Sequence, residues 1–167
     1  MVEGCDRRAP LHGLRPGPRS AGGFTLAEAL TVTAIIVILV AVGVPGFRGL
    51  VQGQRLKTAS FDLFAAVSYA RSEAIARNAT VTIAATSGSW TNGWTVTDSG
   101  GTVLRRQNAL SGITVTGPSA VTYSGTGRLT ASVTPFALTS SDLDPEDGRC
   151  LRIDLSGRPV TKTGTCS

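Results

Sequence analysis

Hydrophobic and polar positions change their pattern twice along this chain. The first pattern is an uncharged, mostly apolar run of nineteen residues from Ala29 to Phe47. As a helix it would span about 28 Å, close to the thickness of the hydrocarbon core of a membrane. A single acid, Glu28, stands directly before the run. Because a carboxylate at the edge of hydrocarbon is costly, Glu28 is a candidate functional residue.

The apolar run continues into an amphipathic stretch, so we predict one long helix from Thr25 to about Asn78. Its first half spans a membrane, and its second half lays an apolar stripe on a sheet. Gly43 and Pro45 predict a kink or local melting, because proline removes a backbone donor and clashes one turn back. Asn78 is the predicted stop, since asparagine tolerates the left-handed conformation. The expected stripe contains Leu56, Phe61, Phe64, Val67, Ala70 or Arg71, Ala74 and Ile75.

Beyond Asn78 apolar residues alternate with hydroxyl-bearing ones, which predicts half-buried strands. Because these strands follow one helix without further helices between them, we expect an antiparallel sheet and the α+β class. The predicted fold is a long N-terminal α-helix packed on an antiparallel β-rich head. An acidic loop from Ser140 to Gly148 is expected to be exposed. The predicted strands lie within 81–85, 94–97, 113–116, 121–124 and 151–155, and turns are predicted at 87–89, 92–93, 99–101, 117–118, 125–127 and 156–159.

Charge adds a leader to this picture. Residues 1–23 hold four arginines against Glu3 and Asp6, together with three prolines and no apolar period. They predict a disordered, positively charged segment on the cytoplasmic side of the membrane. The whole chain has a formal charge of +5. Without the leader it is only mildly basic, which does not by itself imply a nucleic-acid partner.

The cysteines divide by position, with Cys5 in the leader and Cys150 and Cys166 near the other end. If the leader is removed, an even pair remains in a domain beyond the membrane. A disulfide between Cys150 and Cys166 would close a short loop and contribute about 3 kcal/mol. Two free thiols are the alternative. With no histidine nearby, this pair does not predict a metal site.

The sequence contains no arrangement of residues that predicts catalysis. The sole histidine, His12, lies in the leader, and there is no Ser/His/Asp set, phosphate-binding glycine loop or metal-ligand spacing. We therefore expect neither an enzyme nor a cofactor. Arg71, Glu73 and Arg77 lie on the amphipathic helix and form either subunit contacts or ion pairs with each other and the sheet.

The segment Gly23-Phe24-Thr25-Leu26-Ala27-Glu28 resembles the processing motif of the type IV pilin and type II secretion pseudopilin superfamily. The resemblance implies that prepilin peptidase cuts after Gly23, that Phe24 becomes N-methylated, and that Glu28 is retained. Pro45 falls where such proteins commonly have a helix-breaking proline. The implied division is a removed leader at 1–23, a transmembrane and filament-core helix at 24–51, and an amphipathic helix with a β-rich head at 52–167.

Later segments are similar to the GspH/FimT-type minor pilins. The resemblance implies a structural subunit that primes or caps the assembly of a type IV pilus or a type II secretion pseudopilus. Its implied partners are other pilin or pseudopilin subunits, prepilin peptidase and the inner-membrane assembly platform. Its implied location is the bacterial inner membrane, with one span and a periplasmic head, and later the filament. The segments concerned are 70–78, 81–83, 92–94, 125–128 and 156–158.

The sequence leaves two roles open for Glu28. In a filament, the positive N-terminal amine of a neighbouring subunit would neutralise it, and an unpaired acid in an apolar bundle would be penalised. Glu28 would then retain a subunit where an amine meets it. The alternative is an interfacial acid without a partner in a monomeric anchored domain, for which Glu28 would be dispensable.

A basic group near the C-terminus suggests an alternative function, a pilus-tip receptor that binds DNA during uptake in natural transformation. Phosphate binding by such a group would be non-specific and steeply salt-dependent. Some FimT-like proteins that take up DNA carry a second arginine two places after a Gly-Arg pair, where this chain has Val160, and several acids crowd the same region. The candidate DNA-binding residues are Arg149, Arg152, Arg158 and Lys162.

Overall fold

The computed structural model describes residues 23–166, apart from the side chains of residues 44–46. The leader predicted over residues 1–23 therefore lies, except for Gly23, outside the described residues. By its internal contacts the chain divides into two units, and the boundary lies between Leu39 and Val40.

Helix α1 runs from Leu26 to Arg77, within one residue of the predicted bounds. It ends as predicted, because Asn78 adopts a left-handed backbone with φ 47°. The Ala79 N–H donates to the carbonyl of Ala74 at 3.2 Å, which caps the last turn. The helix continues past Gly43 and Pro45 without a break. The kink expected at these residues stays a prediction.

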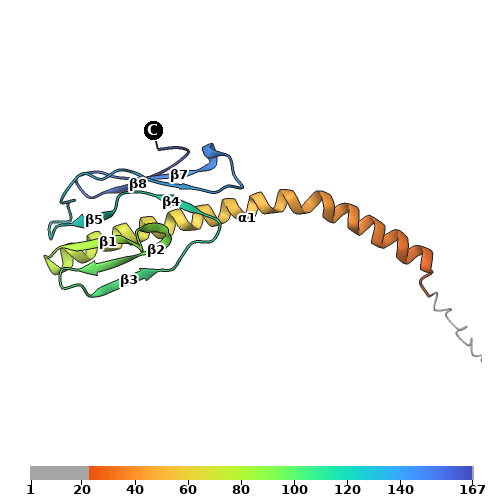
Figure 1. Ribbon diagram of the computed structural model, residues 1–167, viewed down its shortest axis with the longest axis horizontal. Coiled ribbons are helices and arrows are strands. Elements are labelled where there is room, and N and C mark those ends of the chain that lie inside the picture. The colour runs from red at the N-terminus through yellow and green to blue at the C-terminus, as the bar shows by residue number, and fades with distance from the viewer. Residues whose placement is uncertain (1–22, 167) are drawn as a thin grey trace, which may run out of the picture. The chain divides into compact units, whose positions relative to one another are not determined.

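Within residues 23–166, eight strands form two four-stranded antiparallel sheets, which confirms the α+β class (Figure 1). The first sheet has the order β3-β2-β1-β5 and the second has the order β4-β6-β7-β8. Three strands, β3, β6 and β8, were not predicted from the sequence. The bounds are β1 Val81–Thr86, β2 Ser89–Asp98, β3 Val103–Gln107, β4 Thr114–Thr116, β5 Ala120–Tyr123, β6 Phe136–Thr139, β7 Arg149–Ile153 and β8 Pro159–Thr163.

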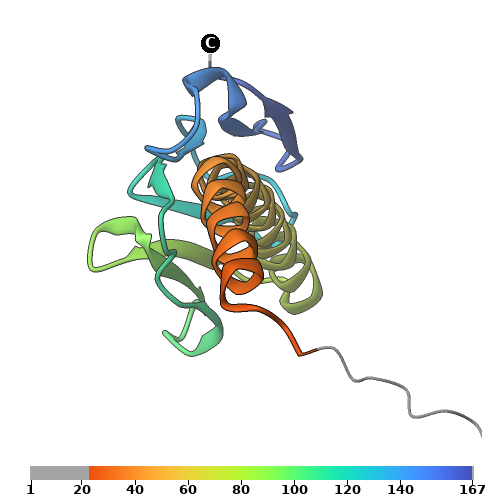
Figure 2. The same cartoon turned by 90° about the vertical axis from the view of Figure 1, so that its right-hand side faces the viewer.

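The second half of α1 lies against both sheets, which cover different sides of it (Figure 2). Its buried stripe is richer in alanine than predicted, and Phe61 and Ile75 were wrongly placed in it, since they are 60% and 50% exposed. Small side chains let a helix approach two sheets at once, while the bulky residues remain at the margins. The buried stripe consists of Leu56, Ala59, Ser60, Leu63, Ala66, Val67, Ala70 and Ala74.

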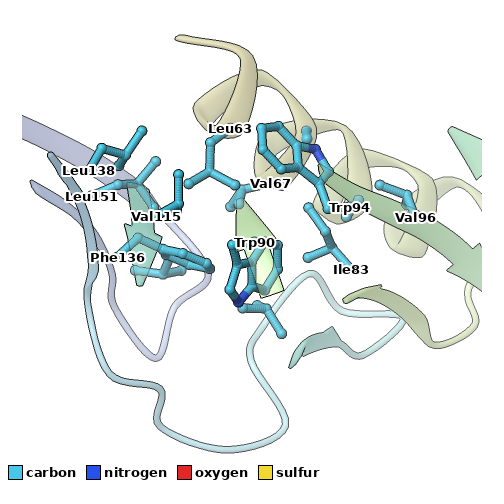
Figure 3. Packing of buried hydrophobic residues seen from close by; sticks show 14 of the residues in the cluster. Leu63, Val67, Ile83, Trp90, Trp94, Val96, Val115, Phe136, Leu138 and Leu151 are labelled. Carbon is cyan, nitrogen blue, oxygen red and sulfur yellow. The ribbon is translucent and has the colours of Figure 1, made fainter. Parts of the chain in front are cut away.

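Trp90 joins the two sheets into one core (Figure 3). Its ring lies 6.3 Å from that of Trp94 in the first sheet and meets Phe136 of the second sheet edge to face at 4.7 Å. Its indole N–H donates to the carbonyl of Pro118 at 2.6 Å. An aromatic pair in this geometry stabilises by about 0.5–1.5 kcal/mol beyond its buried area.

A bulge in β2 places Trp90 in this position. The bulge contains Asn92-Gly93, so the turn predicted at these two residues was wrong. Thr86 pairs with Ser89 while Ala85 pairs with Trp94, so the residues between them leave the ladder. Gly93 fits here because its φ is 92° and a Cβ would lie 2.1 Å from the carbonyl oxygen of Gln107. The turn between β1 and β2 lies at Ser87-Gly88, within the turn predicted at 87–89.

The acidic loop from Ser140 to Gly148 is mostly exposed, as predicted. It contains a short 3₁₀ helix, η1, over Pro145–Asp147, and Leu143 packs against the core. Leu155 was expected to alternate inward with Leu151 but is 54% exposed, because β7 ends at Ile153 and the chain turns there.

Cys150 and Cys166 form a disulfide with a sequence separation of 16, as predicted. Cys150 is fully buried and pairs in register with Lys162 across β7 and β8. The bond therefore holds the segment after β8 against the second sheet.

We predict that replacing both Cys150 and Cys166 by alanine destabilises the folded chain by about 3 kcal/mol, because the unfolded chain regains the freedom of the closed loop. Urea unfolding of the full chain in detergent, followed by tryptophan fluorescence, measures this loss. Reductant should destabilise the parent chain and leave the double variant unchanged. An equal stability of parent and variant would contradict the prediction.

Candidate functional site

The start of α1 presents an exposed apolar surface. Every side chain from Phe24 to Gly43 is exposed, and Phe24 itself is 80% exposed. The window Leu26–Gly43 has a mean hydropathy of 2.4, with none of it buried, and is long and apolar enough to cross a membrane. Such a surface is far larger than the apolar patches that soluble monomers expose, so it requires lipid or other protein around it.

Glu28 lies in the first turn of this helix and is exposed. Its backbone N–H donates to the Thr25 hydroxyl oxygen at 3.2 Å, which caps the helix. Within the described residues the Glu28 carboxylate has no hydrogen-bond or ion-pair partner. The sequence interpretation overlooked this cap, although Thr25-x-x-Glu28 matches the capping-box signature.

Two glycine turns, 125–127 and 156–158, meet between the helix and the sheets. The Arg71 guanidinium donates through Nε to the carbonyl of Gly127 at 3.0 Å. The Tyr123 hydroxyl donates to the carbonyl of Gly157 at 3.4 Å. Gly157 has φ 81°, and a Cβ on it would lie 2.1 Å from the Gly127 carbonyl oxygen. These segments, which the sequence predicted as turns, therefore hold the two sheets to α1.

Burial raises the pKa of Tyr123 far above its ordinary value, despite the opposing effect of Arg71. The Ser156 hydroxyl, followed by the Arg158 backbone N–H, lowers the pKa of the exposed Asp154 by donating hydrogen bonds to its carboxylate. Tyr123 thus remains a neutral donor at physiological pH, and Asp154 remains an acceptor that shapes the β7–β8 turn.

Glu73 and Arg77 form ion pairs, as the second of their two sequence interpretations expects, whereas Arg71 hydrogen-bonds a backbone carbonyl; subunit contacts by these residues stay a prediction. Arg77 pairs with Glu73 at 2.8 Å and approaches Asp98 of β2 at 3.5 Å. Arg71 binds the Gly127 carbonyl. Exposed pairs of this kind stabilise by about 0–1 kcal/mol, so they position the end of the helix more than they stabilise it.

The four C-terminal cations are divided between two faces and a turn. Arg152 has the same register parity as Cys150, which pairs with Lys162, so Arg152 and Lys162 share one face of the β7–β8 hairpin. Arg149 belongs to the other face and its guanidinium bonds the Thr163 hydroxyl. Arg158 lies in the hairpin turn. Arg149 and Lys162 nevertheless line one small pocket together with Lys57, and DNA binding by the four candidate residues stays a prediction.

Trp94 is buried in the core, and Trp90 is buried beside it. Among residues 23–166 no cluster of three or more histidine, cysteine, aspartate or glutamate side chains is arranged to hold a metal ion. The surfaces that remain as candidates for function are the apolar start of α1 and the grooves beside its second half.

About two thirds of the chain has the fold of a type IV minor pilin. Two crystal structures of the type IV minor pilin FimU from Pseudomonas aeruginosa are similar to it. The first, in space group P21, has a TM-score of 0.58 at 23% identity and covers 68% of this chain and 92% of that one. The second, in space group P65, has a TM-score of 0.55 at 24% identity, with coverages of 64% and 91%.

A family model described as type II transport protein GspH matches residues 59–157. The match covers more than half of the chain, and the chain belongs to this family. None of the curated proteins compared matches the chain.

We predict that Gly157→Ala destabilises the chain more than Gly101→Ala does. The two glycines have nearly the same φ, 81° and 82°, but nothing lies within 4 Å of a Cβ on Gly101. The left-handed backbone costs alanine about 1–2 kcal/mol at either position. At Gly157 overpacking against the Gly127 carbonyl adds about 1–3 kcal/mol. Urea unfolding of both variants measures the difference, and equal losses would refute the junction described above.

Proposed function

We propose that the chain is a minor pilin or pseudopilin, a structural subunit that primes or caps a type IV pilus or a type II secretion pseudopilus. The observation that carries this proposal is the exposed, membrane-length apolar start of α1 on a head of the GspH family. The fold shared with the minor pilin FimU supports it.

The proposal divides the chain as the sequence predicted. Residues 1–23 are the leader, which prepilin peptidase removes before N-methylating Phe24. Residues 24–51 anchor the precursor in the inner membrane by a single span and later pack in the filament core. Residues 52–167 place the β-rich head in the periplasm. The disulfide fits an oxidising compartment, where such bonds persist.

Glu28 retains the subunit in the filament. Its carboxylate is exposed beside an apolar surface and unpartnered within the described residues, so burial in an apolar bundle would be costly without a cation. The N-terminal amine of a neighbouring subunit, freed by cleavage before Phe24, supplies that cation. The partners that this role requires are the assembly platform and other pilin subunits.

The first test concerns the leader. Mass spectrometry of the chain purified from the membranes of its own bacterium should find a mature N-terminus at Phe24 carrying one methyl group. In a strain that lacks prepilin peptidase, the same chain should keep its leader. A chain that begins at Met1 or Val2 in the parent strain would refute processing.

The second test replaces Glu28 by alanine. Because Thr25 is bonded by the backbone N–H of residue 28, the helix cap survives this change. The variant should be processed and membrane-bound in normal amounts, yet at least about tenfold depleted from sheared filaments, since an unpaired amine is left in the bundle.

Glu146→Ala is the matched control, because Glu146 is an exposed acid in η1 and its removal changes the charge equally. It should leave incorporation unchanged. Normal incorporation of Glu28→Ala would indicate a monomeric anchored domain instead.

A further inference from the structure

A groove follows the second half of α1 on the side of the second sheet. It encloses about 590 Å³ between the helix and the loop that contains η1. Gly49, Gly53 and Lys57 recur at steps of four, so they lie on one helix face and form the floor of the groove. A Cβ on Gly49 or Gly53 would meet nothing within 4 Å, so the floor is open as far as Lys57. Leu50 and Leu143 add apolar side chains to the lining.

The groove adjoins a smaller recess that is lined mainly by polar groups. Lys57 and Arg149 line both cavities. The recess encloses about 120 Å³, against about 30 Å³ for one water in the liquid, so it has room for an oxyanion. The rest of its lining consists of Ser60, Phe61, Thr161, Lys162 and Thr163.

Two polar groups of the recess lack hydrogen-bond partners within residues 23–166. The first is the hydroxyl of Ser60, a residue that is only 5% exposed. The second is Arg149 Nε, which is buried, although another nitrogen of the same guanidinium bonds the Thr163 hydroxyl. A buried donor without an acceptor is costly, so a ligand that brings oxygen atoms into the recess would remove this cost.

The charges of the two cavities favour an anion. Lys57 is exposed and Arg149 is half-buried, and neither forms an ion pair within the described residues. Among the residues that line the cavities, Asp147 is the one acid, so the cations outnumber it. A phosphate accepts hydrogen bonds from several donors at once, and both arginine and lysine bind it. The recess therefore suits a phosphate group of a ligand with a net negative charge.

The place of the groove along α1 indicates a lipid as the source of this phosphate. Phe47 and Leu50, 66% and 62% exposed, continue the apolar surface beyond Gly43, where the candidate membrane span ends. Lys57 follows Phe47 by ten residues, about 15 Å of helical rise, and helical side chains tilt back toward the N-terminus. A long lysine side chain thus brings its ammonium close to the headgroup layer that borders the hydrocarbon.

Double-stranded DNA fits this geometry less well than a lipid does. DNA binding uses several cations that contact successive phosphates on an open surface. Here Lys57 and Arg149 converge on one small recess, which adjoins a groove with apolar lining. A glycerophospholipid matches both parts, because its phosphate suits the recess and its acyl chain suits the surface of Leu50 and Leu143.

We propose that the recess binds the phosphate of an anionic glycerophospholipid from the periplasmic leaflet, with the start of an acyl chain along the groove. Lys57 and Arg149 neutralise the phosphate, and the Ser60 hydroxyl and Arg149 Nε donate to its oxygens. This inference rests on the single membrane span of the proposed function. It goes beyond that function because the head gains its own contact with the membrane before assembly.

Native mass spectrometry of the full chain in detergent measures the lipid that the protein retains. The probes are phosphatidylglycerol, which is anionic, and phosphatidylcholine, which has the same phosphate but no net charge. The parent chain should retain one phosphatidylglycerol at least about fivefold more often than one phosphatidylcholine, since each nearby lysine or arginine favours an anionic lipid by about that factor.

Charge variants test the recess. Lys57→Glu should reduce the retained phosphatidylglycerol at least about fivefold. Its matched control is Arg55→Glu, which reverses an exposed cation of the same helix that lines neither cavity and should have no effect. Thr161→Asp places an acid at the exposed edge of the recess and should also reduce retention. Thr165→Asp, an exposed position outside both linings, should not.

A change of shape tests the groove without changing its charge. Gly53→Leu fills the open floor, and the fold tolerates it because a Cβ there meets nothing within 4 Å. The variant should retain less phosphatidylglycerol than the parent. Thr58→Leu adds an apolar side chain to an exposed position of the same helix outside both linings, so it should retain as much as the parent.

Two competitors distinguish the possible sources of phosphate. Inorganic phosphate and a short DNA duplex, each at the concentration of the lipid, should leave the phosphatidylglycerol bound, because neither has an acyl chain for the groove. Displacement by either would assign the recess to that ligand and overturn the inference. Equal retention of the two lipids, or retention insensitive to both Lys57→Glu and Gly53→Leu, would overturn it as well.

Filament content of the parent chain is measured separately. If the parent enters filaments but shows no selective lipid retention, the inference falls and the proposed function stands. If the parent retains the lipid through Lys57 but never enters filaments, the lipid site stands and the filament function falls.

Discussion

A single helix in this chain has to satisfy two surroundings, and most of the structure follows from that constraint. From Phe24 to Gly43 every side chain of this segment is exposed, although nearly all are apolar. From Leu56 to Ala74 the helix buries a narrow stripe against two sheets. Burial of apolar area is the main favourable term in folding, so the second stretch organises the head, while the first can gain it only from lipid or another protein.

The head meets this constraint through two junctions made by small residues. At one junction, the bulge in β2 places Trp90 between the sheets. Gly93 in the same bulge permits the close approach of the start of the β3–β4 segment. At the other, Gly157 packs on the Gly127 carbonyl, which Arg71 of the helix also binds. At both junctions another backbone segment occupies the space that a Cβ would need, so close packing requires glycine at each.

The elements with strong local signals could be predicted from the sequence. The helix from Leu26 to Arg77, its stop at Asn78 and the disulfide between Cys150 and Cys166 were all expected. Such features depend on composition, period and local backbone preference, which a single sequence displays.

The missed elements depend on tertiary contacts. β3 is an edge strand whose exposed arginines hide the alternation, β8 is an edge strand that starts at Pro159, and β6 is only four residues long. Asn92-Gly93 resembles a hairpin turn locally, yet it lies inside β2, in the bulge that β2 forms opposite β1. Likewise Phe61 suits the helical period but is 60% exposed, because its neighbours Ala59 and Leu63 occupy the buried stripe instead.

The candidate site shows the same division between local and tertiary information. Counting charges brought Arg149, Arg152, Arg158 and Lys162 together, but strand parity separates Arg149 from Arg152, since successive residues of a strand point to opposite faces. Glu28 differs because the role proposed for it needs no fold around it. Thr25 caps the helix through a backbone N–H and leaves the carboxylate unused within the described residues. In the proposed filament, burial of this carboxylate among apolar helices would be costly unless another chain brought a cation to it.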